Sequence, residues 1–185
     1  QGITVVHSIP GRANVIGGLS GVFRTHGRNA EAMTVRFPQS LVINLGEAPK
    51  ETYKDRQPQT RMGTAALIRQ AFTDAANLKK KTDAAKINGK DKDSPDRSLK
   101  KEALVLALEK KVQTIFAAQQ ADDILTGLRL AEEFQLDAAI ALAAEGYLVR
   151  EQLNAAKVPV FLHPTMQRAG GSLETYHSHL GTASA

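Results

Sequence analysis

Residues 112–162 read VQTIFAAQQADDILTGLRLAEEFQLDAAIALAAEGYLVREQLNAAKVPVFL, and this stretch decides the fold. Short apolar runs alternate there with longer segments whose apolar residues recur at helical spacing. The expected strands cover residues 112–117, 138–142 and 158–162, and the expected helices cover residues 122–134 and 145–155. Strands that alternate with helices in this way are typical of βαβ units on a parallel sheet.

The N-terminal part predicts β-structure of a second kind. The apolar, β-branched run at residues 3–9 predicts a buried strand that ends at Pro10-Gly11. Because the sequence begins within an expected core strand, we expect it to be a segment of a longer chain. Residues 22–25 and 33–37 alternate apolar and polar side chains, which predicts a small β excursion. Further downstream we expect a short strand at residues 41–45 and helices at residues 67–78 and 99–108, the second capped by Ser98.

Three stretches predict loops. Residues 11–21 are rich in glycine, which permits sharp turns or close approach to a ligand. Residues 46–61 are polar and contain two prolines. Residues 79–97 hold seven Lys and Arg against four Asp and carry no aromatic residue that could stack on bases. We therefore interpret residues 79–97 as a charged, solvated loop and expect no nucleic-acid partner.

The composition excludes several classes of protein. The chain has 185 residues, 42% of them hydrophobic and 23% charged, which are values of a single globular segment. It has no cysteine, so disulfides, Cys–zinc sites and thiol catalysis are excluded, although the compartment stays open. No apolar run is long enough for a membrane helix, and we expect no membrane partner. The net charge of +5 keeps an anion-binding or nucleic-acid-binding module open as an alternative.

Doubly wound sheets and (β/α)8 barrels both satisfy the alternation of strands and helices. In either architecture, ligands collect at the carboxyl ends of the parallel strands. The expected strand ends are Pro10-Gly11, Gly46-Glu47, Ala117-Ala118-Gln119, Leu142-Ala143-Ala144 and His163-Pro164.

Four segments in order carry a family resemblance over nearly the whole chain. They are GITVV with PGRANVIGG in residues 2–18, GEAPK at 46–50 with TRMG at 60–63, ADDILTGLRLAEEF at 121–134, and EGY at 145–147 leading to VPV at 158–160. Together they resemble the amidohydrolase superfamily, in particular its imidazolonepropionase-related branch.

The resemblance implies a partial (β/α)8 TIM-type barrel. Residues 1–185 would form one central segment that lacks the first barrel strand and the last strand or strands. It also implies a parent enzyme that hydrolyses non-peptide C–N bonds of amides or cyclic amides. In active relatives a zinc-like divalent metal activates water, because a bound metal polarises the carbonyl and lowers the pKa of water.

The sequence departs from the family pattern at the metal ligands. The resemblance places the fifth-strand and sixth-strand histidines at Ala117 and Leu142, and neither side chain binds metal. The first-strand His-x-His and the eighth-strand Asp would fall outside residues 1–185. We therefore expect no cofactor in this chain and no activity of the chain alone. The alternative is a catalytically silent relative that acts as a binding or scaffold protein. In either case we expect self-association or pairing with the missing barrel portion.

Six residues are candidates for contact with a small amide-type substrate. Asn14, Gly17 and Gly18 could present backbone N–H groups to an oxyanion or substrate, or could simply form a turn. Glu47 could bind metal or orient water, and with Lys50 it could equally form a structural ion pair. Arg61 could hold a substrate carboxylate or anchor its loop.

The histidines are weaker candidates. His163 follows a strand on the side where barrel sites form, and His7 lies in the first expected strand. His177 and His179 form a His-x-His in a polar region, where surface residues are the simpler interpretation. No Ser–His–Asp order is legible, so the sequence identifies no catalytic residue.

Overall fold

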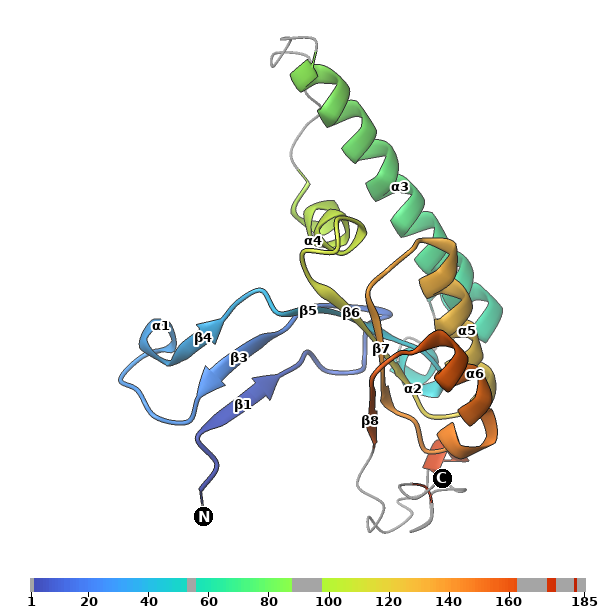
Figure 1. The fold of residues 1–185 in the computed structure, drawn as a ribbon. Helices are drawn as coiled ribbons and strands as arrows, with labels where there is room; N and C mark the ends of the chain where they lie inside the picture. Colours follow the sequence, from blue (N-terminus) through green and yellow to red (C-terminus); the bar gives the residue numbers. More distant parts are fainter. Residues whose placement is uncertain (1, 53–55, 88–97, 163–172, 176–181, 183–185) are drawn as a thin grey trace.

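A five-stranded sheet forms the centre of the chain (Figure 1). The computed structural model describes residues 2–52, 56–87, 98–162, 173–175 and 182. The sheet has the order β2 (Ile16–Leu19), β5 (Ser40–Asn44), β6 (Gln113–Ala118), β7 (Ala138–Leu142) and β8 (Val160–Leu162). Strands β5 to β8 are parallel, and β2 pairs antiparallel with β5 at the edge.

Strands β5 to β7 bury apolar side chains on both faces, as is typical of parallel sheets. All five residues of β5 are buried. Because side chains alternate along a strand, one face contributes to the main core and the other to a separate cluster. The main core contains Leu41, Ile43, Phe116 and Ile140. The second cluster contains Val42, Ile115, Ala139 and Ala141.

Three helices lie along one side of the sheet in Figure 1. They are α3 (Arg61–Ile87), α5 (Ala121–Glu133) and α6 (Arg150–Ala156), the last preceded by the 3-10 turn η2 (Gly146–Val149). Phe72 of α3 stacks on Phe134, with ring centroids 5.0 Å apart. Gly127 lets α5 approach β6 closely, because a Cβ there would lie 3.2 Å from Cβ of Phe116. Helix α4 (Leu99–Leu108) packs on α3 and begins after Ser98, as predicted, but the Ser98 side chain makes no capping hydrogen bond.

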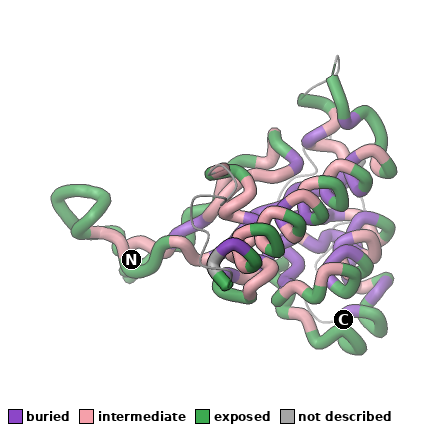
Figure 2. Tube along the Cα trace, turned by 90° about the horizontal axis from the view of Figure 1, so that it is seen from above, coloured by how far each residue is buried: buried purple, intermediate pink, exposed green. Residues whose placement is uncertain are grey.

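A small antiparallel arm projects from the central sheet (Figure 1). Its strands β1 (Val5–Ser8), β3 (Gly21–Arg24) and β4 (Thr34–Arg36) have the order β1-β3-β4, with helix α1 (Ala30–Met33) before β4. The predicted β excursion is confirmed. The predicted burial of the first strand is wrong, since every residue of β1 is exposed. Figure 2 shows this arm extending away from the buried body.

Two predicted loops contain helices. Residues 46–61 include α2 (Glu47–Thr52). The expected charged loop at residues 79–97 is wrong for residues 79–87, which continue α3. There Lys79 and Asp83 pair across one helical turn at 2.7 Å, and Ala85 is buried, so the charged segment has both a polar and a packed face. Residues 88–97 lie outside the described residues.

The glycine-rich stretch at residues 11–21 also differs from its prediction, because residues 16–19 form β2 with a register shift between Ile16 and Gly18. The mixed α/β class and the alternation along residues 112–162 are confirmed. The described part of the sheet is open, with β2 and β8 at its edges, and closure into a barrel stays a prediction. None of the described helices is long and apolar enough to cross a membrane.

Candidate functional site

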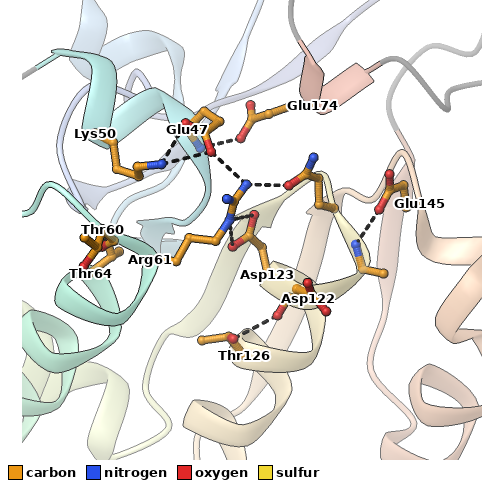
Figure 3. A network of polar contacts seen from close by, with 12 residues as sticks. Glu47, Lys50, Thr60, Arg61, Thr64, Asp122, Asp123, Thr126, Glu145 and Glu174 are labelled. Atoms are coloured by element: carbon orange, nitrogen blue, oxygen red, sulfur yellow. Dashed lines mark hydrogen bonds and ion pairs between the residues drawn. The ribbon is translucent and has the colours of Figure 1, made fainter.

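Charged side chains gather where β5 and β6 end. Glu47 follows β5, and Asp123 lies in the first turn of α5, just beyond β6. Arg61 is the first residue of α3 and reaches both of them (Figure 3). This is the carboxyl edge of the parallel strands, where ligands of such folds bind.

Arg61 is the centre of this cluster. Its Nε donates to both carboxylate oxygens of Asp123, at 3.0 and 3.2 Å. Its Nη2 lies 2.9 Å from Oε1 of Glu47 and also donates to Oε1 of Gln120. A cation at a helix N-terminus opposes the helix dipole, so these acceptors are needed to hold it there. The geometry therefore fits an anchor between the β5 and β6 loops.

Glu47 is engaged through both of its carboxylate oxygens. Nζ of Lys50 donates to Oε1 at 3.0 Å and to Oε2 at 2.9 Å. These hydrogen bonds lower the pKa of Glu47, against the opposing effect of burial, and the charge of Arg61 lowers it further. Glu47 is thus held as an anion in an ion pair with Lys50 and Arg61, and its predicted role toward metal or water stays a prediction.

Asp123 and Arg61 show how burial competes with pairing. Burial raises the pKa of Asp123, and the charge and hydrogen bonds of Arg61 offset this only in part. For Arg61, burial acts to lower the pKa, but the charge of Asp123 and its hydrogen bond outweigh burial and raise it. Asp123 is only 4% exposed in its side chain, so its ionised form depends on this partner.

A third carboxylate ties the C-terminal segment to the same edge. Oε1 of Glu174 accepts a hydrogen bond from the backbone N–H of Glu47 at 2.6 Å, and Oε2 pairs with Nη2 of Arg12 at 3.1 Å. Gly46 makes this approach possible. Its φ is +86°, and a Cβ there would overlap Oε1 of Glu174 and lie 3.0 Å from Oδ2 of Asp123.

Two further polar residues shape the neighbouring loops. Nδ2 of Asn44, the last residue of β5, donates to the carbonyl oxygens of Gly11 and Asn14 at 3.3 and 2.7 Å. This bond fixes the loop that carries Arg12. On the other side, Oε2 of Glu145 accepts from the backbone N–H of Ala121 at 2.9 Å, which caps α5 (Figure 3).

The structure brings together Glu47, Lys50 and Arg61 among the predicted site residues. The backbone carbonyl of Asn14 accepts the hydrogen bond from Asn44, and no contact of Asn14 with those three residues is shown. Gly17 and Gly18 belong to β2, and a Cβ on Gly17 would lie 3.2 Å from Nδ2 of Asn44. Gly17 thus permits close packing of β2 on β5, whereas Gly18 has a φ of +115° where the register of this pair shifts.

The histidines do not join this cluster within the described residues. His7 lies on the exposed arm, where Nε2 is 2.8 Å from Oγ of Ser20 and partial burial lowers the pKa of the imidazole. His163, His177 and His179 lie outside the described residues.

The described residues do not fit the metal that the family resemblance implies. Among them no group of three or more His, Cys, Asp or Glu could hold an ion. Ala117 is the penultimate residue of β6 and Leu142 is the last residue of β7, and both have aliphatic side chains that cannot bind a metal. The buried side-chain oxygens of Asn44 and Gln119 have no hydrogen-bond partner among the described residues, but amide oxygens are not the usual ligands of zinc.

The sequence did not point to Asp123, Glu174 or Arg12 as site residues. Arg12 and Asp123 lie within the motifs that carry the family resemblance, but the sequence assigned neither of them a role in the site. Their partners lie 62 and 162 positions away in the chain, so no local pattern reveals them. The only local signal is that Arg12 directly follows Pro10-Gly11, where the first strand is expected to end.

Comparison with known proteins adds one close structural relative. No protein-family model matches the sequence, and no curated protein matches it. The crystal structure of an amidohydrolase from Thermotoga maritima MSB8 is similar, with a TM-score of 0.94 and 36% sequence identity. The match covers 99% of this chain and 48% of the T. maritima chain, so this chain spans about half the length of its relative. The similarity supports the resemblance to amidohydrolases, but it does not identify the imidazolonepropionase-related branch.

Proposed function

We propose that this chain is the central part of an amidohydrolase whose full-length protein hydrolyses non-peptide C–N bonds of amides or cyclic amides. The observation that carries the proposal is the similarity to the T. maritima amidohydrolase over 99% of the chain at 36% identity. The assignment to the imidazolonepropionase-related branch rests on the motif resemblance alone and is part of the same proposal.

The carboxyl edge suits a supporting role in such an enzyme. Arg12, Lys50 and Arg61 are paired there with Glu174, Glu47 and Asp123, so that three positive charges meet three negative ones. This balanced cluster holds the loops after β5 and β6 in place and leaves little net charge for an ionic substrate. A neutral amide is therefore the better match to this edge than a charged ligand.

Hydrolysis of an amide needs an activated water, and the described residues do not supply its activator. The metal ligands of an active full-length protein would accordingly lie outside the described residues. One observation favours a second candidate, a catalytically silent relative that binds a ligand or a partner. It is the presence of aliphatic side chains at Ala117, the penultimate residue of β6, and at Leu142, the last residue of β7.

The test is hydrolysis of a panel of cyclic and acyclic amides, with matched esters and peptides as controls, in the presence of zinc or manganese. We expect the full-length protein to release product from at least one non-peptide amide and the 185-residue chain alone to release none. Amide binding without turnover by the full-length protein would favour the silent relative. Hydrolysis of esters or peptides alone would contradict the proposed reaction class.

A further inference from the structure

Two buried amide side chains at the carboxyl edge of the sheet carry unsatisfied oxygen atoms. Asn44 is the last residue of β5 and is fully buried, and Gln119 directly follows β6 and is 2% exposed. Oδ1 of Asn44 and Oε1 of Gln119 have no hydrogen-bond partner among the described residues. A buried oxygen without a donor costs free energy, so this pair of atoms indicates that a donor binds there.

The orientation of the Asn44 amide is fixed by its own hydrogen bonds. Nδ2 donates to the carbonyl oxygens of Gly11 and Asn14 at 3.3 and 2.7 Å. A rotation that exchanged the nitrogen and oxygen of the side chain would place oxygen against oxygen at both contacts. Oδ1 of Asn44 therefore remains an acceptor, and only a hydrogen-bond donor can satisfy it.

The two amides lie on the same face of the sheet. Strands β5 and β6 are parallel, and Asn44 pairs with Ala117. Because side chains alternate along a strand, Asn44 shares a face with Val42, and Gln119 continues the face of Ile115 and Ala117. Val42 and Ile115 belong to the second apolar cluster, so both amides lie at the carboxyl end of that cluster.

The surroundings of the two amides select an uncharged ligand. The second cluster as described consists of aliphatic residues: Val42, Ile115, Ala139 and Ala141, with Leu142 packed against them. A charged ligand would lose its hydration there without meeting an opposite charge, whereas a neutral donor loses much less. The charged side chains of the edge are already paired with one another, as the Arg61 contacts show.

The same edge also offers a buried donor. Nε of Arg12 has no hydrogen-bond partner among the described residues, although Nη2 pairs with Glu174. Arg12 lies in the loop that Asn44 fixes through the carbonyl oxygens on either side of it. An amide has an N–H that donates and a C=O that accepts, so it matches acceptors and a donor on one edge. Water also donates and accepts, and the test has to separate these two ligands.

The backbone after β7 holds Gln119 in position. The N–H of Ala143 donates to the carbonyl oxygen of Ala118 at 2.8 Å, and the N–H of Glu145 donates to that of Gln119 at 2.9 Å. Leu142 and Ala143 have φ values of +80° and +43°, which are unfavourable for residues with a Cβ. Backbone strain of this kind is concentrated at functional sites, so the turn after β7 fits a recognition site.

We propose that Asn44 and Gln119 recognise a small uncharged amide, whose N–H donates to this pair of side-chain oxygens. Both oxygens are buried by the chain itself, so a segment that packs on an exposed face of the chain does not satisfy them. Only a small group can reach them, and the long side chain of Gln119 can turn to admit it. The proposal rests on the proposed function, since it names a part of the substrate, but binding alone tests it.

The test is a ligand-observed NMR titration of the full-length protein with acetamide, N-methylacetamide and N,N-dimethylacetamide. These probes carry two, one and no N–H groups, while their apolar surface increases. We expect the dissociation constant of N,N-dimethylacetamide to exceed that of acetamide about tenfold, because the dimethyl probe leaves the oxygens unsatisfied. The same spectra report any hydrolysis, so binding without turnover and turnover without this preference are separate results.

Two variants locate the preference. Gln119→Met removes the acceptor and keeps the length of the side chain, and Gln152→Met makes the same change at an exposed position of α6. We expect Gln119→Met to lose most of the preference for acetamide and Gln152→Met to keep it. Circular dichroism checks that both variants are folded. A preference that persists in Gln119→Met, or equal binding of the three probes by the parent, would overturn the proposal.

A crystal structure of the full-length protein with saturating acetamide is the second measurement, and it does not depend on a variant. We expect the amide nitrogen within about 3 Å of Oδ1 of Asn44 or Oε1 of Gln119. Water, or a group of the protein itself, at both oxygens would overturn the proposal. Failure of the parent to bind any of the three probes would overturn it as well.

Discussion

Replacement of Gly46 by alanine is expected to lower the free energy of unfolding by about 3–4 kcal/mol. Two effects add at this position. A φ of +86° is unfavourable for any residue with a Cβ, and the added methyl would overlap Oε1 of buried Glu174. Glu174 cannot withdraw cheaply, because it accepts the hydrogen bond from Glu47 and pairs with Arg12. The measurement is urea unfolding at equilibrium, followed by circular dichroism.

The matched control is Gly11→Ala in the neighbouring loop. A Cβ on Gly11 would meet nothing within 4 Å, so its effect should stay within about 0.5 kcal/mol. If both variants lost the same stability, or neither lost any, the close contact between residue 46 and Glu174 would be refuted.

Replacement of Arg61 by methionine is expected to cost about 2–3 kcal/mol of unfolding free energy. The change removes the partner of Asp123, whose side chain is only 4% exposed, and one of the two partners of Glu47. An unpaired buried carboxylate is costly, although the 37% exposure of the Arg61 side chain admits water and reduces the loss. Urea unfolding at neutral pH measures the difference.

Arg69→Met provides the control on the same helix. Arg69 pairs with Glu133 at 2.7 Å, but both side chains are at least 40% exposed, and we expect a change of about 0.5 kcal/mol or less. A double variant with Asp123→Asn should recover part of the loss in Arg61→Met, since the unpaired charge is removed. Equal losses in Arg61→Met and Arg69→Met would argue against a buried anchor at Arg61.

The elements along residues 112–162 could be predicted because their signal is local. Each strand is a short apolar run, and α5 combines a helical stripe with Asp122 and Asp123 in its first turn, so burial and dipole agree. Strand β7 has the predicted bounds, Ala138–Leu142. The expected single helix at residues 145–155 divides into η2 and α6, which periodicity alone does not resolve.

The prediction failed where tertiary contacts override local preference. Gly17 and Gly18 are poor strand formers, yet pairing with β5 makes them part of β2. Lys79 to Ile87 look like a solvated loop by charge, but α3 continues through them because α4 packs on it. Strand β1 has the composition of a core strand, but nothing in the sequence shows whether a second layer covers it.

The candidate site was predicted in part. Glu47, Lys50 and Arg61 were singled out because they lie in motifs that follow a strand end, and the structure brings them together. The other half of the cluster, Asp123 and Glu174, comes from distant parts of the chain. Only the fold shows that Arg61 is neutralised from the β6 side and that Glu174 closes over Gly46.

The central claim is that the carboxyl edge of this chain is held by paired charges and that no group of its described residues forms a metal site for hydrolysis. We propose that the same holds for the whole chain. The most direct test is the metal content of the purified chain after incubation with zinc and manganese and removal of the excess. The account predicts far less than stoichiometric metal. About one tightly held metal ion per chain would contradict it, and would mean that residues such as Glu47, His7, His163, His177 and His179 converge and that Ala117 and Leu142 do not mark lost ligands.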